Sequence, residues 1–94
     1  MNNIKVTTTN SFVRNLKKFK KKHYDLTKLD TVVQALISQD TLALHRHSDH
    51  ALTGKYKGYR ELHISSDWLL VYRFLNNHLE LLLVDTGSHD DLFK

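Results

Sequence analysis

Three consecutive β-strand patterns, separated by turns of two residues, constrain the fold of this sequence more than any other feature. Polar and apolar residues alternate over 59–64, which predicts a strand with one face toward a core. A second strand is expected over 67–75, after a turn at Ser65-Ser66, and a third over 78–86. Asn76-Asn77 suits the turn between the last two strands, because asparagine tolerates a positive φ. The second half of the chain therefore predicts an antiparallel meander.

The last strand carries an almost continuous apolar run, formed by Leu79, Leu81, Leu82, Leu83 and Val84. A run of this kind favours a central strand that is covered on both faces or shielded by a partner. A helical turn over 88–93, capped by Ser88, is expected to end the chain.

The first half predicts one strand and two helices. β-Branched residues alternate over 4–8, which predicts a strand. A helix is expected over 12–23, capped by Asn10 or Ser11, with a core stripe formed by Phe12, Leu16 and Phe19. A loop of about three residues follows, so the two helices are expected to form a hairpin.

The second helix is expected to begin at Asp25 or Thr27, and its apolar face comprises Leu29, Val32, Val33, Leu36 and Ile37. Residues 40–51 show no periodic pattern and are expected to be irregular. The order β-α-α-β-β-β predicts an α+β fold in a single small domain over residues 1–94. We expect a mostly antiparallel four-stranded sheet packed against an N-terminal helical hairpin.

Composition excludes several classes of protein. The chain has no cysteine, which excludes disulfides, thiol catalysis and cysteine-ligated metal centres. Its N-terminus has no apolar segment typical of a signal peptide, and no apolar run approaches the ~20 residues that span a bilayer. We therefore expect a cytoplasmic protein with no membrane contact.

The positive charge is concentrated in the first predicted helix. The chain has 14 Lys and Arg against 10 Asp and Glu, and six of the cations fall in that helix: Arg14, Lys17, Lys18, Lys20, Lys21 and Lys22. A block of like charge indicates an anionic partner, nucleic acid first. The alternative is a solvated helix face without a specific partner.

Four polar residues that a hydrophobic core does not need border the predicted strands: His50, His63, Asp67 and His89. RNA cleavage needs a base for the ribose 2′-hydroxyl proton and an acid for the departing 5′-oxygen, and histidine serves both near neutral pH. A cation must also stabilise the charge on the phosphate, for which the nearby candidates are Arg60, Lys55 and Lys57. These residues indicate a small basic domain that binds or cleaves RNA.

Each of these residues has a structural alternative. A single histidine near a strand end is commonly a surface residue, and Asp67 could cap the turn before Trp68. Trp68 and Phe93 could be core aromatics or, if exposed, could stack on bases. Zinc is a further alternative for the histidines, with candidate ligands His45, His47, His50, His63 and His89, although they show no compact ligand spacing.

Four motifs follow one another along the chain: Asp49-His50-x-Leu52-x-Gly54, Gly58-x-Arg60-x-x-His63-Ile64, Asp67-Trp68-Leu69-Leu70-Val71-Tyr72 and Thr86-Gly87-Ser88-His89-x-x-Leu92-Phe93. Together with the element order, they resemble the YafQ family of toxins from type II toxin–antitoxin systems, within the RelE/ParE superfamily. The resemblance covers nearly the whole chain. It departs from the family pattern at Ala51, where proline is common, and at His45, Arg46 and His47 just before the first motif.

The resemblance implies a ribosome-dependent mRNA endoribonuclease (an mRNA interferase) that cuts in the A site by acid–base transesterification. It implies no metal and no cofactor. Family catalytic positions map onto His50, His63, Asp67 and His89, with His89 as the leading general acid and the other three sharing proton abstraction and orientation. RNA-binding positions are expected at Arg60, Trp68, Phe93, Lys55, Lys57 and Arg73, although Arg73 could instead pair with an acidic neighbour.

The same resemblance implies the partners. They are mRNA, the A site of the 30S subunit and a cognate DinJ-like ribbon-helix-helix antitoxin. The toxin would contact operator DNA only through this antitoxin. The expected ribosome contacts are Lys17, Lys18, Lys20, Lys21 and Lys22. Two alternatives remain: an inactive homologue that binds RNA or the ribosome, and a ParE-like toxin that binds gyrase, whose members lack the histidine set.

Overall fold

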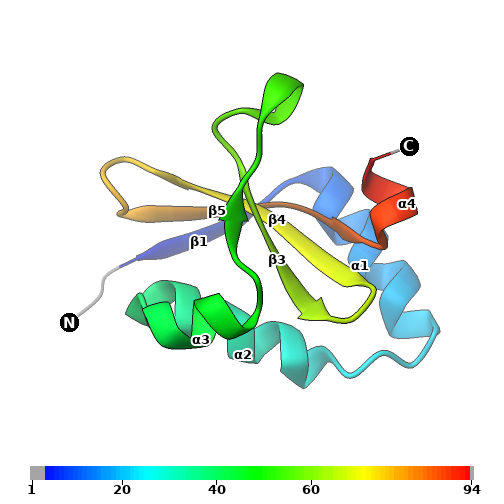
Figure 1. Ribbon diagram of the computed structural model, residues 1–94. Coiled ribbons are helices and arrows are strands. Elements are labelled where there is room, and N and C mark those ends of the chain that lie inside the picture. Colours follow the sequence, from blue (N-terminus) through cyan, green and yellow to red (C-terminus); the bar gives the residue numbers. More distant parts are fainter. Residues whose placement is uncertain (1–3, 94) are drawn as a thin grey trace.

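The computed structural model describes residues 4–93 as a five-stranded mixed sheet with helices packed against it (Figure 1). The strand order is β1-β5-β4-β3-β2. The bounds are Lys5–Thr8 for β1, His50–Ala51 for β2, Arg60–Ser65 for β3, Trp68–Leu75 for β4 and Glu80–Gly87 for β5. β1 runs parallel to β5 and the other pairs are antiparallel. The α+β prediction is confirmed, with one strand more than expected.

The additional strand and an additional helix both lie in the segment that was predicted to be irregular. The helix, α3, spans Thr41–Arg46 and begins at Asp40, whose carboxylate accepts a hydrogen bond from the Ala43 amide at 3.1 Å. β2 has two residues and pairs with β3. Elements of six and two residues are too short to show periodicity, so the prediction was wrong here.

The longer helices begin with side-chain caps. α1 spans Asn10–Lys21, and its cap is Thr9 rather than Asn10 or Ser11. The Thr9 hydroxyl accepts from the Phe12 amide and donates to the Val84 carbonyl at 2.5 Å, so a contact with β5 fixes where α1 starts. α2 spans Leu26–Ser38 and is capped by Asp25, one of the two residues predicted to begin it.

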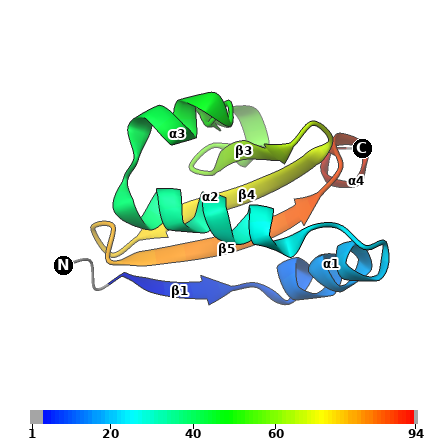
Figure 2. The same ribbon diagram turned by 90° about the horizontal axis from the view of Figure 1, so that it is seen from below.

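The core lies between the helices and one face of the sheet (Figure 2). α1 packs on β5 and α2 on β3. The buried residues are Phe12, Phe19, Leu29, Val32, Leu36, Leu62, Ile64, Trp68, Leu70, Tyr72, Leu81 and Leu83. The predicted apolar stripes of both helices contribute to this set, and β5 is a central strand, as its apolar run indicated.

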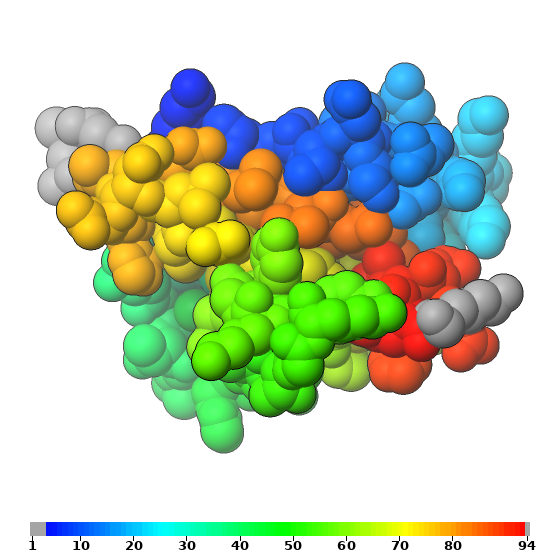
Figure 3. Space-filling model, turned by 90° about the horizontal axis from the view of Figure 1, so that it is seen from above, coloured from blue at the N-terminus to red at the C-terminus, as the bar shows by residue number. Residues whose placement is uncertain are grey.

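The opposite face of the sheet is covered only in part. The loop between β2 and β3, which contains a 3-10 turn at Gly54–Tyr56 (η1), and the terminal helix α4, His89–Leu92, meet over this face (Figure 3). β5 is visible between them and α1. We call this side the open face. No helix within residues 4–93 has the length and apolar character needed to cross a membrane.

Candidate active site

One row of paired residues across the sheet brings distant parts of the chain together. His63 of β3 pairs with Leu69 of β4, and Leu69 pairs with Gly87 at the end of β5. Adjacent strands lie about 4.8 Å apart, so His63 is about 10 Å from the segment that continues into His89. Asp67 lies in the exposed turn between β3 and β4, at the same end of the sheet. His63, Asp67 and the segment that leads to His89 therefore lie at one end of the sheet, and His50 pairs with Glu61, two residues before His63.

The alternation of β3 decides which of its residues reach the open face. Leu62 and Ile64 are in the core, so Glu61 and His63 point to the other side. This arrangement agrees with the predicted alternation over 59–64.

His50 is held from both of its ring nitrogens. Its Nδ1 lies 2.7 Å from the Ser48 carbonyl oxygen, and its Nε2 lies 3.5 Å from a carboxylate oxygen of Glu61, its partner in the β2–β3 register. The His50 side chain is half exposed, whereas the Glu61 side chain is only 6% exposed. Because both neighbours are hydrogen-bond acceptors, a ring carrying both protons can donate to each.

Glu61 is the site residue that sequence reasoning missed. It is the only residue with a charged side chain that is buried among residues 4–93, and its Oε2 has no hydrogen-bond partner among them. A buried, unpaired carboxylate oxygen is costly, which indicates a role other than stability. The sequence placed Glu61 on the same face as His63, but the pairing with His50 depends on the short strand that the sequence did not predict.

α4 holds His89 through a reciprocal cap. The Ser88 hydroxyl accepts from the Asp91 amide, and the Asp91 carboxylate accepts from the Ser88 amide, both at 3.1 Å. The hydrogen bond from the Ser88 amide and then the Ser88 side chain, with smaller contributions from Lys22 and Lys18, lower the pKa of Asp91 below its usual value. His89 is the first residue of the helix and is exposed.

Gly87 allows this helix to turn back closely on the strand. A Cβ at Gly87 would lie 3.0 Å from the Cβ of Asp91, closer than most real Cβ contacts.

Phe93 lies beside His89 and closes an aromatic hollow. Its ring centroid is 5.3 Å from that of His89 and 5.3 Å from that of Tyr56. The rings of Tyr56, Tyr59 and Phe93 line a hollow of about 200 Å³ on the open face, with Val71 and Val84 among the other lining residues.

Trp68 is part of the core. It is 1% exposed, stacks on Phe19 and donates a hydrogen bond to the Thr86 hydroxyl at 2.9 Å. Thr86 in turn donates to the Leu69 carbonyl at 2.7 Å. A base could stack on Trp68 only if the ring left the core, so the core alternative describes its place in this structure.

Arg60 faces the helices, away from the open face. Its guanidinium lies 2.8 Å from the Asp49 carboxylate, which also accepts a hydrogen bond from the Tyr72 hydroxyl. The bond to Asp49 raises the pKa of Arg60, and burial followed by the bond to Asp49 raises that of Tyr72. The structure therefore gives Arg60 a carboxylate partner within the fold.

Other predicted cations lie around the aromatic hollow or near it. The Lys55 ammonium is 5.3 Å from the Tyr56 ring centroid, and the Arg73 guanidinium is 5.6 Å from that of Tyr59. Lys57 is exposed in the same loop as Lys55.

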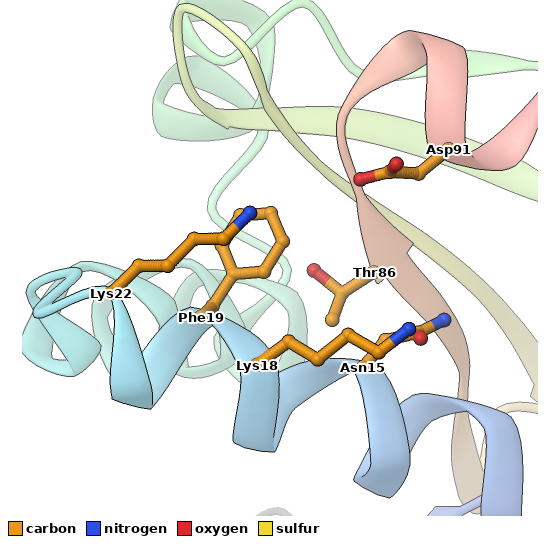
Figure 4. A pocket seen from close by; sticks show the side chains of 6 residues that line it. All are labelled: Asn15, Lys18, Phe19, Lys22, Thr86 and Asp91. Carbon is orange, nitrogen blue, oxygen red and sulfur yellow. The ribbon is translucent and has the colours of Figure 1, made fainter.

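One lysine of α1, Lys18, and the residue that follows this helix, Lys22, reach into a second hollow, of about 300 Å³, between α1 and α4 (Figure 4). Lys18 and Lys22 extend over it, and Asp91 lies opposite. Lys17, Lys20 and Lys21 are exposed on α1. In residues 4–93, no group of three or more His, Asp or Glu side chains is arranged to hold a metal ion.

Comparison with known proteins gives consistent matches over almost the whole chain. A family model described as "Bacterial toxin of type II toxin-antitoxin system, YafQ" matches residues 4–94. The mRNA interferase toxin YafQ of Escherichia coli strain K12 is 36% identical over 83 residues, which are 87% of either chain.

Solved structures are similar over the same length. A crystal structure of YafQ from E. coli strain BL21(DE3) has a TM-score of 0.85 and 30% identity, covering 97% of this chain and 99% of that one. A chain of the crystal structure of the E. coli DinJ–YafQ toxin–antitoxin complex has a TM-score of 0.80 and 33% identity, covering 98% of this chain and 99% of that one. The similarity therefore includes the sheet, the helices and the terminal segment with His89.

Proposed function

Because this chain belongs to the YafQ family of toxins from type II toxin–antitoxin systems, we propose that it cleaves mRNA on the ribosome, in the A site. Its relatives are named mRNA interferases, and the corresponding enzymatic class is endoribonuclease. The observation that carries the proposal is the shared position of three histidines beside the open face. His50 pairs with Glu61, two residues before His63 on the same face of β3, and His63 lies in the row that leads to His89. Histidine can both accept the 2′-hydroxyl proton and donate a proton to the 5′-oxygen near neutral pH.

The proposed reaction is a transesterification. The ribose 2′-oxygen loses its proton to a base and attacks the adjacent phosphorus, while the bond from phosphorus to the 5′-oxygen breaks. An acid protonates that oxygen, so the products are a 2′,3′-cyclic phosphate and a 5′-hydroxyl. Well-placed acid and base groups contribute about 10²–10⁴-fold in rate.

We assign the general acid to His89. It is exposed, and the cap of α4 and the ring of Phe93 fix its position. Neither contact engages it with a carboxylate, so its ring is accessible to a leaving group.

His50, His63 and Asp67 share proton abstraction and orientation in this proposal, with Glu61 as a further member of the group. Glu61 touches the His50 ring nitrogen and fixes its direction. Trp68 supports the site indirectly, because its bond to Thr86 holds the end of β5 from which the His89 segment continues.

The ribosome supplies what the small site lacks. The ribosome can hold the mRNA with its 2′-oxygen in line with the leaving group. This orientation lowers the activation barrier and so raises the cleavage rate. The exposed lysines of α1, together with Lys18 and Lys22 over their hollow, fit the phosphates of ribosomal RNA. Binding that depends on such contacts weakens steeply as salt increases.

A cognate antitoxin is the expected protein partner. E. coli YafQ forms a complex with DinJ, and the chain of that complex covers 98% of this one. By analogy, we propose a ribbon-helix-helix antitoxin that blocks ribosome entry and carries the toxin to operator DNA.

The test is cleavage of a reporter mRNA in a translating extract, read as new 5′ ends. We expect in-frame cuts that require translation and disappear in His89→Ala. His45→Ala removes an exposed histidine from α3, outside the site, and is expected to cut normally. Equal cutting of naked RNA would contradict the ribosome dependence. Ribosome binding without cutting by the unaltered protein would indicate the inactive homologue.

A further inference from the structure

The aromatic hollow on the open face has the shape and surroundings of a base-binding site. Its three rings come from three separate places: Tyr56 from η1, Tyr59 from the residue before β3, and Phe93 from the end of α4. All three are half-buried, so one side of the hollow remains open to solvent. A volume of about 200 Å³ is sufficient for one planar heterocycle.

The hollow is adjacent to the proposed reacting groups. Phe93, which forms one wall, contacts the ring of His89 at 5.3 Å between centroids. Val71, which also lines the hollow, is the register partner of Glu61 on β3, and directly paired residues point to the same face. A group held in the hollow is therefore bracketed by His89 and by the pair of Glu61 and His50.

The charged side chains around the hollow indicate which kind of ligand it binds. Lys55 lies over the Tyr56 ring and Arg73 over the Tyr59 ring, so two cations border a hollow whose walls are aromatic and aliphatic apart from Asp85. The Asp85 carboxylate accepts hydrogen bonds from Ser11 and Asn15. A flat apolar slot bordered by cations is complementary to a nucleotide, whose base stacks while its phosphates meet the charges. An apolar peptide side chain would use the slot but leave the cations without partners.

We propose that this hollow binds the nucleobase immediately downstream of the scissile phosphate, unstacked from the mRNA. The downstream side follows from the contact between Phe93 and His89, because the proposed acid protonates the 5′-oxygen of the downstream nucleotide. This inference rests on the proposed function. Base stacking in the hollow positions the leaving group, so Tyr56, Tyr59 and Phe93 are binding residues.

The direct test removes the base and leaves the backbone intact. Ribosomes are programmed with an mRNA in which the nucleotide immediately downstream of the scissile phosphate is abasic. The single-turnover cleavage rate of this abasic codon is compared with that of the intact codon. We expect loss of the base to slow the unaltered protein by about 5- to 150-fold, the range that one stacked base provides. Tyr56→Ala should slow cleavage of the intact codon and add little further loss on the abasic one, because contacting groups are not additive.

Two controls make the result decisive. Tyr56→Phe keeps the ring and should behave as the unaltered protein, which separates stacking from folding. Leu42→Ala changes an exposed residue of α3 and should retain the full penalty for the abasic codon.

Three outcomes would overturn the proposal in different ways. No ribosomal cleavage of either codon would contradict the proposed function itself. Equal cleavage of the two codons by the unaltered protein would contradict base binding while leaving the nuclease intact. If Tyr56→Ala weakened antitoxin binding and left both cleavage rates unchanged, the hollow would belong to the antitoxin.

Discussion

His47 and His63 hold each other through two hydrogen bonds that run in opposite directions. The His63 amide donates to the His47 carbonyl at 2.8 Å, and Nδ1 of the His47 ring lies 2.7 Å from the His63 carbonyl oxygen. Because a carbonyl only accepts, Nδ1 carries the proton. His47 thereby attaches the end of α3 to β3 at His63. His50 lies only three residues after His47.

We predict that His47→Phe impairs cleavage without preventing ribosome binding. The ring would retain its volume and lose its hydrogen bond, which contributes about 0.5–1.5 kcal/mol to stability. Small displacements of His50 and His63 should slow single-turnover cleavage by about 10- to 100-fold. Chemical denaturation and cleavage on programmed ribosomes measure the two effects. A normal rate in a destabilised protein would mean that His47 only supports the fold.

Glu61→Gln should separate activity from stability. The substitution keeps the shape and removes a buried charge whose second oxygen has no partner among residues 4–93, so stability should be unchanged or higher. Cleavage should fall by about 10- to 100-fold, because the side chain that orients His50 loses its charge.

A double-mutant cycle gives the matching control for Glu61. If Glu61 acts through His50, then Glu61→Gln should add little to the loss caused by His50→Ala. Independent, multiplying losses would show that Glu61 acts on another group.

Gly87→Ala should displace α4. The added Cβ would lie 3.0 Å from the Asp91 Cβ, an atom fixed to the helix backbone, so α4 must shift. A crowded site of this kind typically costs about 1–3 kcal/mol. We expect cleavage to fall through displacement of His89 and Phe93, while ribosome binding through α1 persists. Gly54→Ala adds a Cβ with nothing within 4 Å and tests the effect of backbone strain alone, since its φ is +65°.

The cap of α4 should respond to acid. The bonds from Ser88 lower the pKa of Asp91 below its usual 3.8, so the cap contributes stability above that value. This contribution is lost as pH falls through the lowered pKa of the folded state. An NMR titration of the Asp91 carboxyl should show this midpoint. Ser88→Ala keeps the Ser88 amide, which contributes most, and removes the hydroxyl, so it should move the midpoint only part of the way back toward 3.8. An unchanged midpoint in Ser88→Ala would show that the hydroxyl contributes nothing and that the Ser88 amide acts alone.

Much of the fold follows from local patterns in the sequence. Strand alternation places Glu61 and His63 on one face and Leu62 on the other, and the structure retains that arrangement. Periodic stripes locate α1 and α2, because each helix is long enough to repeat its apolar face. The cap of α1 is Thr9 rather than the predicted Asn10 or Ser11, because the Thr9 hydroxyl is held by a hydrogen bond to β5, which is far along the chain.

The details of the site depend on contacts that no local pattern contains. The pairing of His50 with Glu61 requires β2, which has only two residues. Arg60 is close to the histidines in sequence, but its strand position turns it toward Asp49 on the helix side. Trp68 directly follows Asp67, yet it is buried while Asp67 is exposed. Proximity along the chain predicted the region of the site but not the partner of each side chain.

His89 is proposed to protonate the leaving 5′-oxygen, and replacing that oxygen by sulfur removes the need for this proton. An mRNA whose bridging 5′-oxygen at the cleavage site is replaced by sulfur has a leaving group that departs without a proton, because a thiol is far more acidic than an alcohol. On programmed ribosomes, His89→Ala should cut the oxygen substrate poorly and the sulfur substrate at nearly the rate of the unaltered protein. His50→Ala should remain slow on both. If sulfur fails to restore cleavage in His89→Ala, the general acid is another group.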